Sequence, residues 1–174
     1  LLNSPASDVF FYASNGHGVW EAASANLGSD QHSLLIAGSG HFSDQWAIQT
    51  TALGLPVIRT PHTEGQPIDV AAIEAALRAD TQHHIAAVMV VHTDTASGIT
   101  SDLQAIRKAI NSTGHPALYV VDVVASLGAA PFDMDALGAD VCLGSSQKGL
   151  MMPPGLGFVA VNAKAFAWSK AHAK

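Results

Sequence analysis

Short apolar runs rich in β-branched residues alternate along the chain with longer segments in which apolar positions recur every three or four residues. The short runs predict strands, and the longer segments predict helices. Several of the runs are apolar at consecutive positions, as expected for strands that are buried on both faces. The predicted strands are Val9–Ala13, Ser33–Ala37, Pro56–Arg59, Ile85–His92, Ala117–Asp122, Asp140–Leu143 and Gly157–Val161.

The predicted helices lie between these strands, and some are bounded by residues typical of helix ends. Asp69 is a suitable N-cap for a helix over Val70–Arg78. Asp102 has the same place before Leu103–Asn111, and Gly114 follows the end of that helix. The remaining predicted helices are Gly18–Leu27 and Phe42–Leu53.

Repeated strand–helix–strand units with short connections predict an α/β fold. We expect a three-layer sandwich in which helices cover both faces of a mostly parallel mixed sheet. The turn Pro153–Gly155 reverses the chain quickly, so Gly157–Val161 is expected to run antiparallel to its neighbour. No internal repeat or Gly/Ser-rich linker divides the 174 residues, which predicts a single domain over residues 1–174.

Composition and charge exclude several classes of protein. The chain is 48% hydrophobic and 13% charged, which excludes intrinsic disorder. Its net charge is −6 and no stretch is dominated by Lys or Arg, so we expect no nucleic-acid partner. The longest apolar run, Ile85–Val91, is too short to cross a membrane. The single cysteine, Cys142, and the lack of a visible signal peptide predict a cytoplasmic protein with no membrane partner.

Polar residues follow two of the predicted strands at the end where ligands bind in sheets of this kind. Ser14–Gly18 joins the first strand to a helix, and its glycines and the helix N-terminus would suit a phosphate group. An ordinary strand-to-helix turn would have the same sequence. Asp122 closes an apolar strand, where a carboxylate is costly to bury unless it meets a cation or a donor. A turn-forming or helix-capping aspartate is the alternative.

Lys148 lies between the predicted strand Asp140–Leu143 and the apolar segment Leu150–Pro154. We expect this environment to desolvate the amine, which would lower the pKa of the lysine and increase its nucleophilicity. The alternative is a lysine whose stem covers apolar surface while its amine stays in water. An amine nucleophile, a buried carboxylate and a phosphate-binding turn together suit pyridoxal 5'-phosphate (PLP). Phe42 could stack on such a cofactor, although core packing explains this residue as well.

The sequence around these residues resembles the class V aminotransferases of fold type I, specifically the alanine/serine–glyoxylate aminotransferase branch. The most specific part of the likeness is Val120–Gly128, followed by Gly144–Lys148 and Pro153–Gly155. Asn15–Ala22 is similar to the family's phosphate loop and the helix after it. His92–Gly98 is similar to its His-x-[Glu/Asp]-[Ser/Thr]-x-[Ser/Thr]-Gly segment. The likeness extends over nearly the whole chain.

The resemblance implies a role for each matching residue and no metal site. Lys148 would form a Schiff base with PLP and shuttle the proton, and Asp122 would pair with the pyridinium nitrogen. His41 is a less favoured substitute for the aromatic residue that stacks on the ring. The remaining cofactor contacts would come from Gln147 and Thr95 at the ring hydroxyl, Val124 beneath the ring, Phe42 stacked on it, and Asn15, Gly16 and His17 at the phosphate.

The implied function is a PLP-dependent aminotransferase that transfers an amino group from alanine or serine to glyoxylate or pyruvate by a ping-pong route. Its implied partners are small amino acids, 2-oxo acids and a second copy of the chain in a homodimer. Members of the family are longer, and their C-terminal small domain holds the arginine that binds the substrate carboxylate. We therefore expect these residues to form an incomplete PLP-binding large domain without the small domain. None of Arg59, Arg78 and Arg107 is expected to take the place of that arginine.

Other functions stay open on the sequence. Aminoethylphosphonate, ureidoglycine and pyridoxamine aminotransferases share the same core. Cysteine desulfurase is disfavoured, because Cys142 falls in a predicted buried strand. A metal-dependent hydrolase could use His92, Asp94 and Asp122 as ligands, but no motif with ligand spacing supports it. An inactive fragment that binds PLP weakly or only dimerises is the remaining alternative.

Overall fold

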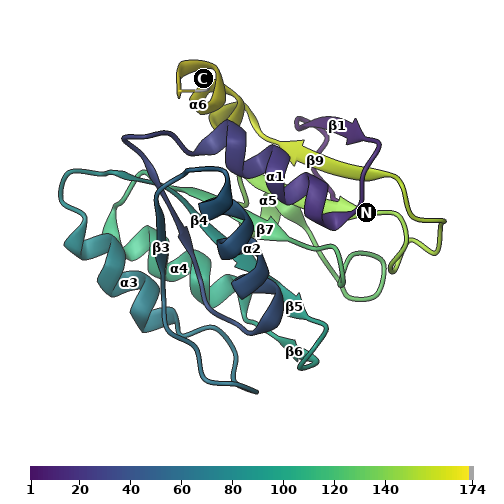
Figure 1. Cartoon of the computed structure of the whole chain (residues 1–174), viewed down its shortest axis with the longest axis horizontal. Helices are drawn as coiled ribbons and strands as arrows, with labels where there is room; N and C mark the ends of the chain where they lie inside the picture. Colours follow the sequence, from purple (N-terminus) through teal and green to yellow (C-terminus); the bar gives the residue numbers. More distant parts are fainter. Residues whose placement is uncertain (173–174) are drawn as a thin grey trace.

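A seven-stranded sheet forms the middle layer of the structure, a computed structural model that describes residues 1–172 (Figure 1). The strand order across the sheet is β1-β9-β8-β7-β4-β2-β3. The strands are β1 (Asp8–Tyr12), β2 (Ser33–Ile36), β3 (Val57–Arg59), β4 (Ile85–Val91), β7 (Leu118–Asp122), β8 (Val141–Ser145) and β9 (Gly157–Val161).

The sheet is mixed and mostly parallel. Neighbouring strands from β3 to β8 all pair in parallel, whereas β9 pairs antiparallel with both β8 and β1. The turn after β8 places Gly157 opposite Ser145 and Val161 opposite Val141. The predicted antiparallel course of β9 is therefore confirmed.

Helices cover both faces of the sheet and complete the predicted three-layer α/β sandwich. Figure 1 shows α1 and α2 in front of the strands. The core of that face includes residues of α1, α2 and α6, and the core of the other face includes residues of α3, α4 and α5. The helices are α1 (Gly16–Leu27), α2 (His41–Ala52), α3 (Val70–Ala79), α4 (Leu103–Thr113), α5 (Met134–Leu137) and α6 (Ala163–His172). Among the described residues, no helix is both long and apolar enough to cross a bilayer.

The central strand β4 shows why its sequence is apolar without alternation. All of its residues are buried. Val88 and Val90 pack into the core on one face, and Met89 and Val91 pack into the core on the other. Because successive side chains of a strand point to opposite faces, a strand between two helical layers needs apolar residues at every position.

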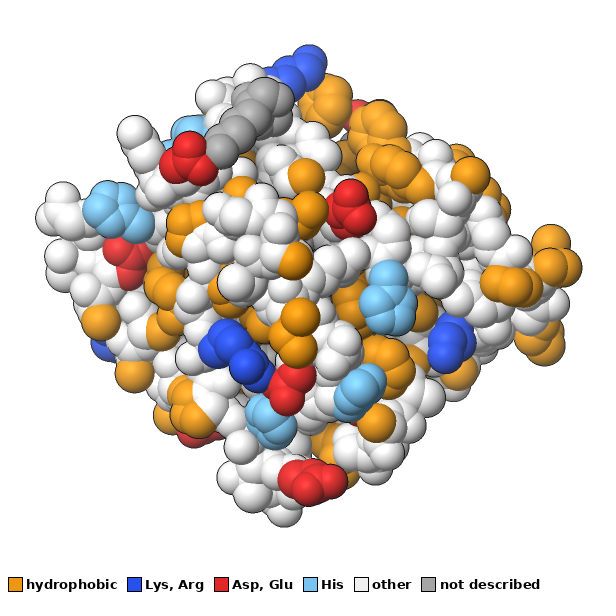
Figure 2. All heavy atoms as spheres, viewed as in Figure 1, with side chains coloured by type: hydrophobic (Ala, Val, Ile, Leu, Met, Phe, Trp, Pro, Cys, Tyr) orange, Lys and Arg blue, Asp and Glu red, His pale blue; other side chains and the backbone are white. Residues whose placement is uncertain are grey.

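The edge strand β1 differs from β4, because all five of its residues are exposed. The exposed fractions of Val9, Phe10 and Phe11 are 41%, 41% and 64%. Figure 2 shows hydrophobic side chains gathered on the upper right of this view, the side on which Figure 1 draws β1 and β9. Acidic and basic side chains are scattered over the rest of this face.

The structure also contains elements that the sequence pattern did not predict. A two-stranded hairpin of β5 (Thr93–Asp94) and β6 (Ile99–Thr100) follows β4, and its strands are too short to show a period. Helix α5 has a single turn. Helix α6 buries only Ala165 and is held by the indole N–H of Trp168, which donates to the Leu27 carbonyl at 3.0 Å.

The strand register places the ends of β4, β7 and β8 together. Val91 lies opposite Asp122, and Asp122 lies opposite Leu143. The segments that leave these parallel strands therefore meet at one edge of the sheet, beside the start of α1.

Candidate active site

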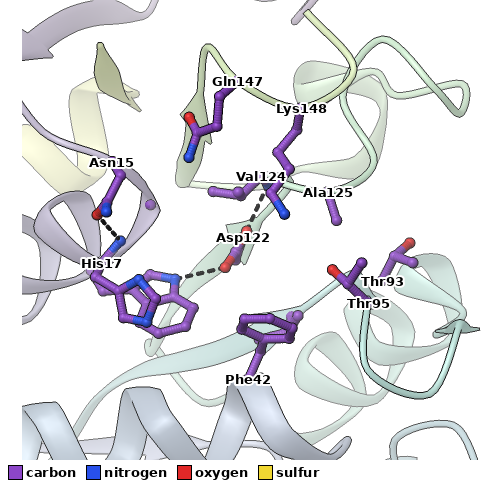
Figure 3. A pocket seen from close by; sticks show the side chains of 13 residues that line it. Asn15, His17, Phe42, Thr93, Thr95, Asp122, Val124, Ala125, Gln147 and Lys148 are labelled. Atoms are coloured by element: carbon purple, nitrogen blue, oxygen red, sulfur yellow. Dashed lines mark hydrogen bonds between the residues drawn. The ribbon is translucent and has the colours of Figure 1, made fainter. Parts of the chain in front are cut away.

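A pocket with a cavity volume of about 170 Å³ lies at this edge. Figure 3 shows side chains from several separate segments of the chain converging on it. Every residue that the sequence analysis assigned to the site lines the pocket: Asn15, Gly16, His17, Phe42, Thr95, Asp122, Val124, Gln147 and Lys148. The other lining residues are Trp20, Val91, Thr93 and Ala125.

Asp122, the last residue of β7, lies at the floor of the pocket and is only 4% exposed. Its Oδ1 accepts the backbone N–H of Val124 at 2.6 Å, and its Oδ2 accepts the indole N–H of Trp20 at 2.6 Å. Burial raises the pKa of the Asp122 carboxyl to about 6, while these two donors and the charge of Lys148 act in the opposite direction. The carboxylate is thus ionised at neutral pH, although it is buried.

Lys148 follows β8 in a turn, and its side chain extends into the pocket toward Asp122 (Figure 3). The expectation that this lysine is desolvated is wrong, because Lys148 is exposed. The apolar segment that was expected to cover it turns outward instead, with Met151 90% and Met152 61% exposed. The amine therefore lies on the open side of the pocket, above a buried carboxylate.

The N-terminus of α1 forms another wall of the pocket. Asn15 caps this helix, since its side-chain oxygen accepts the backbone N–H of His17 at 3.0 Å. No acidic residue lies in the first turn, so the positive end of the helix dipole is not neutralised there. A Cβ atom on Gly16 would lie 3.2 Å from a methyl group of Val124, so glycine allows the helix to approach Val124 closely. These features favour an anion at this end of the pocket.

The remaining predicted residues occupy the sides of the pocket. Phe42 is half-buried at the start of α2, and its backbone N–H donates to Asp94 Oδ2 at 2.9 Å. Phe42 lines the pocket, whereas His41 does not. Thr95 is exposed on the β5–β6 hairpin, and the Gln147 side-chain oxygen accepts the hydroxyl of Ser145. The amide NH₂ of Gln147 is thus left to face a ligand.

Comparison with known proteins identifies the family of this chain. A family model described as "Aminotransferase class-V" matches residues 1–169. The chain belongs to the class V aminotransferase family. Serine–glyoxylate aminotransferase of Methylorubrum extorquens is 43% identical over 165 residues, covering 95% of this chain and 41% of the relative. L-aspartate–glyoxylate aminotransferase of Paracoccus denitrificans is 41% identical over 167 residues, covering 95% and 42%. The chain thus spans about two fifths of the length of these relatives.

A solved structure supports the same fold. A subgroup IV aspartate aminotransferase from Thermus thermophilus superposes with a TM-score of 0.82 at 29% identity. The match covers 93% of this chain and 44% of that one. The predicted α/β architecture is therefore the fold of PLP-dependent aminotransferases.

Trp20 lines the pocket but was not assigned to it from the sequence. It lies on the buried side of α1, stacked on Trp46 with ring centroids 5.5 Å apart. Helical spacing identifies it only as a core residue. Its bond to Asp122 joins residues 102 positions apart, so only the packing of α1 over the sheet reveals it. Val91, Thr93 and Ala125 also line the pocket without having been assigned to it from the sequence.

The alternative functions find little support in this geometry. His92 Nδ1 bonds to Ser126 Oγ at 2.8 Å, whereas Asp94 accepts backbone N–H groups of α2 and of its own hairpin. Within residues 1–172, no group of three or more His, Cys, Asp or Glu side chains could hold a metal ion. Cys142 is buried in β8, and burial raises the pKa of its thiol, which disfavours the reactive thiolate that a desulfurase would need.

No arginine is among the described residues that line the pocket. Each arginine of the chain is bonded elsewhere. Arg59 pairs with Asp44, Arg78 with Glu74, and Arg107 with the side chain of Asn111. That none of the three binds the substrate carboxylate stays a prediction.

Proposed function

We propose that the protein containing this chain is a PLP-dependent aminotransferase that transfers an amino group from a small amino acid, such as alanine or serine, to glyoxylate or pyruvate. The observation that carries the proposal is the meeting of Lys148 and Asp122 in one pocket whose far wall is the N-terminus of α1. Because the chain spans about two fifths of its relatives' length, the proposal concerns the whole protein, of which these residues are the incomplete large domain.

The residues present fit PLP in their chemistry. Asp122 offers a buried, charged acceptor to the ring nitrogen, and the positive end of the α1 helix dipole favours the phosphate. Phe42 and Val124 are suited to contact the ring, and the Gln147 amide and the Thr95 hydroxyl are suited to bind its oxygen. Asn15, Gly16 and His17 would surround the phosphate.

When bound, PLP supplies an electron-withdrawing ring that stabilises negative charge on the substrate carbon. Asp122 would hold a proton at the ring nitrogen, because its carboxylate is ionised above about pH 6. The Lys148 amine would take up a proton and return it to a different atom, as a general base and then a general acid. Its exposure leaves the amine free to move between those positions.

Glyoxylate is favoured as the acceptor, because the names of both curated relatives include it. The donors in these names differ, serine in one and aspartate in the other. The amino donor should therefore be tested with ureidoglycine, aminoethylphosphonate and pyridoxamine as well as with alanine and serine. A homodimer and a cytoplasmic location stay predictions from the resemblance and the composition.

The test is to incubate the full-length protein with PLP, reduce it with borohydride and locate the cofactor by peptide mass spectrometry. We expect the modification on Lys148, and we expect Lys148→Ala to lose both the modification and the transfer of amino groups to glyoxylate. Lys108→Ala, an exposed lysine on α4, is the matched control and should keep both. Modification of another lysine, or full activity of Lys148→Ala, would show that the proposed function is wrong.

A further inference from the structure

Asp122 has a side-chain partner that the proposed function does not use. The indole N–H of Trp20 donates to Asp122 Oδ2 at 2.6 Å, and hydrogen bonds to an ionised carboxylate are stronger than those between neutral groups. The other oxygen is held by the backbone of Val124, which no substitution can remove without changing the turn. The bond from Trp20 is thus the hydrogen bond to Asp122 that a side-chain substitution can remove.

Trp20 is itself fixed from several sides. It is 3% exposed, it stacks on Trp46 at 5.5 Å, and the ring of His17 lies 4.6 Å away. An indole with two torsions packed in this way loses little further freedom when it makes its hydrogen bond. The donor is therefore already oriented before any ligand arrives.

The bond acts on both the direction and the charge of the carboxylate. A donor on each oxygen fixes the plane of the group, and the oxygens keep lone pairs for one more donor from the pocket. A hydrogen bond to the ionised form also opposes the cost of burial. The titratable groups that face Asp122 and Trp20 are Lys148, which follows β8, and His17 on α1.

We propose that Trp20 is a positioning residue for the cofactor: its indole N–H holds the Asp122 carboxylate in one orientation and as an acceptor, ready for the ring nitrogen. This role rests on the proposed function, because it needs a protonated ring nitrogen as the third partner. The bond between Trp20 and Asp122 exists without the cofactor and can be tested separately.

The first experiment uses the cofactor-free protein without altering Trp20. In ¹H–¹⁵N spectra, the indole N–H resonance of Trp20 should shift with pH, with a midpoint near 6 that reports Asp122. This titration should be absent in Asp122→Asn. The indole of Trp46, which donates to Ser24, is the internal reference. An indole signal that does not titrate, or one that titrates unchanged in Asp122→Asn and so does not report Asp122, would overturn the proposal.

The second experiment compares Trp20→Phe with Trp46→Phe. Both variants lose a buried indole from the same stack, but only the first removes a donor from Asp122. PLP affinity should fall as Asp122 becomes protonated. In Trp20→Phe the midpoint pH of this loss of PLP affinity should rise by about one unit, because the Asp122 carboxylate would bind its proton about tenfold more tightly. If both variants shift the pH profile of PLP affinity equally, Trp20 has only a packing role.

The outcomes separate the two proposals. If PLP does not become attached to Lys148 of the wild-type protein, the proposed function fails, and the role of Trp20 toward the cofactor fails with it. The indole titration would still show whether Trp20 controls the carboxylate. If PLP is attached to Lys148 but the profile of Trp20→Phe matches that of the wild type, only the role of Trp20 is refuted.

Discussion

The buried charge of Asp122 should reduce the stability of the cofactor-free protein at neutral pH. In the unfolded chain this carboxyl has its ordinary pKa of 3.8, whereas burial raises its pKa to about 6 in the native state. Between these values the native state binds more protons than the unfolded state, so the free energy of unfolding falls as pH rises. Above about pH 6 the loss levels off at ~3 kcal/mol, from ~1.4 kcal/mol for each pH unit between the two pKa values.

Asp122→Asn removes this ionisation and tests the size of the effect. The amide oxygen can accept only one of the two donors, so the variant loses a hydrogen bond at every pH, and the absolute change in stability is a poor measure. The free energy of unfolding of Asp122→Asn minus that of the wild type should nevertheless increase by about 2 kcal/mol from about pH 4.5 to about pH 7.5.

Urea unfolding of both proteins at the two pH values measures this difference. Asp8→Asn, on the exposed edge strand β1, is the control for replacing an aspartate and should show no such growth. A difference between Asp122→Asn and wild type that is the same at both pH values would refute the reasoning, because Asp122 would then not carry a costly buried charge.

Two further predictions concern close packing. Gly16→Ala places a methyl group about 3.2 Å from Val124, and both residues line the pocket, so PLP affinity should fall about tenfold with little change in Tm. Adding Val124→Ala should restore part of that affinity, and an unchanged affinity in Gly16→Ala would contradict the contact. Cys142 is buried in β8, so labelling by a thiol reagent should proceed only as fast as the protein unfolds. Rapid labelling of the native protein would show that β8 is accessible.

Much of the fold follows from local sequence. The unbroken apolar run of β4 predicts a strand between two layers, and the Pro-Pro-Gly turn predicts the antiparallel β9; both are confirmed. The hairpin of β5 and β6 is too short for any period to indicate it. Helix α6 depends on tertiary contacts such as that of Trp168 with Leu27, and these leave no local signal.

Some features of the site could likewise be predicted from the sequence, and others could not. The residues assigned to it lie at strand ends and a helix start, which a parallel sheet gathers at one edge, so their meeting in one pocket was predictable. The exposure of Lys148 could not be predicted, because it depends on the path of the exposed segment that follows this lysine. The bond from Trp20 to Asp122 depends on how α1 packs over the sheet, and no spacing along the chain encodes that contact.

The most direct test of the central claim is a crystal structure of the full-length protein grown with PLP. We predict that the cofactor is attached to Lys148, with its ring nitrogen on Asp122, its phosphate at the start of α1 and its ring between Phe42 and Val124. PLP bound at another place, or bound here with its ring nitrogen turned away from Asp122, would contradict it.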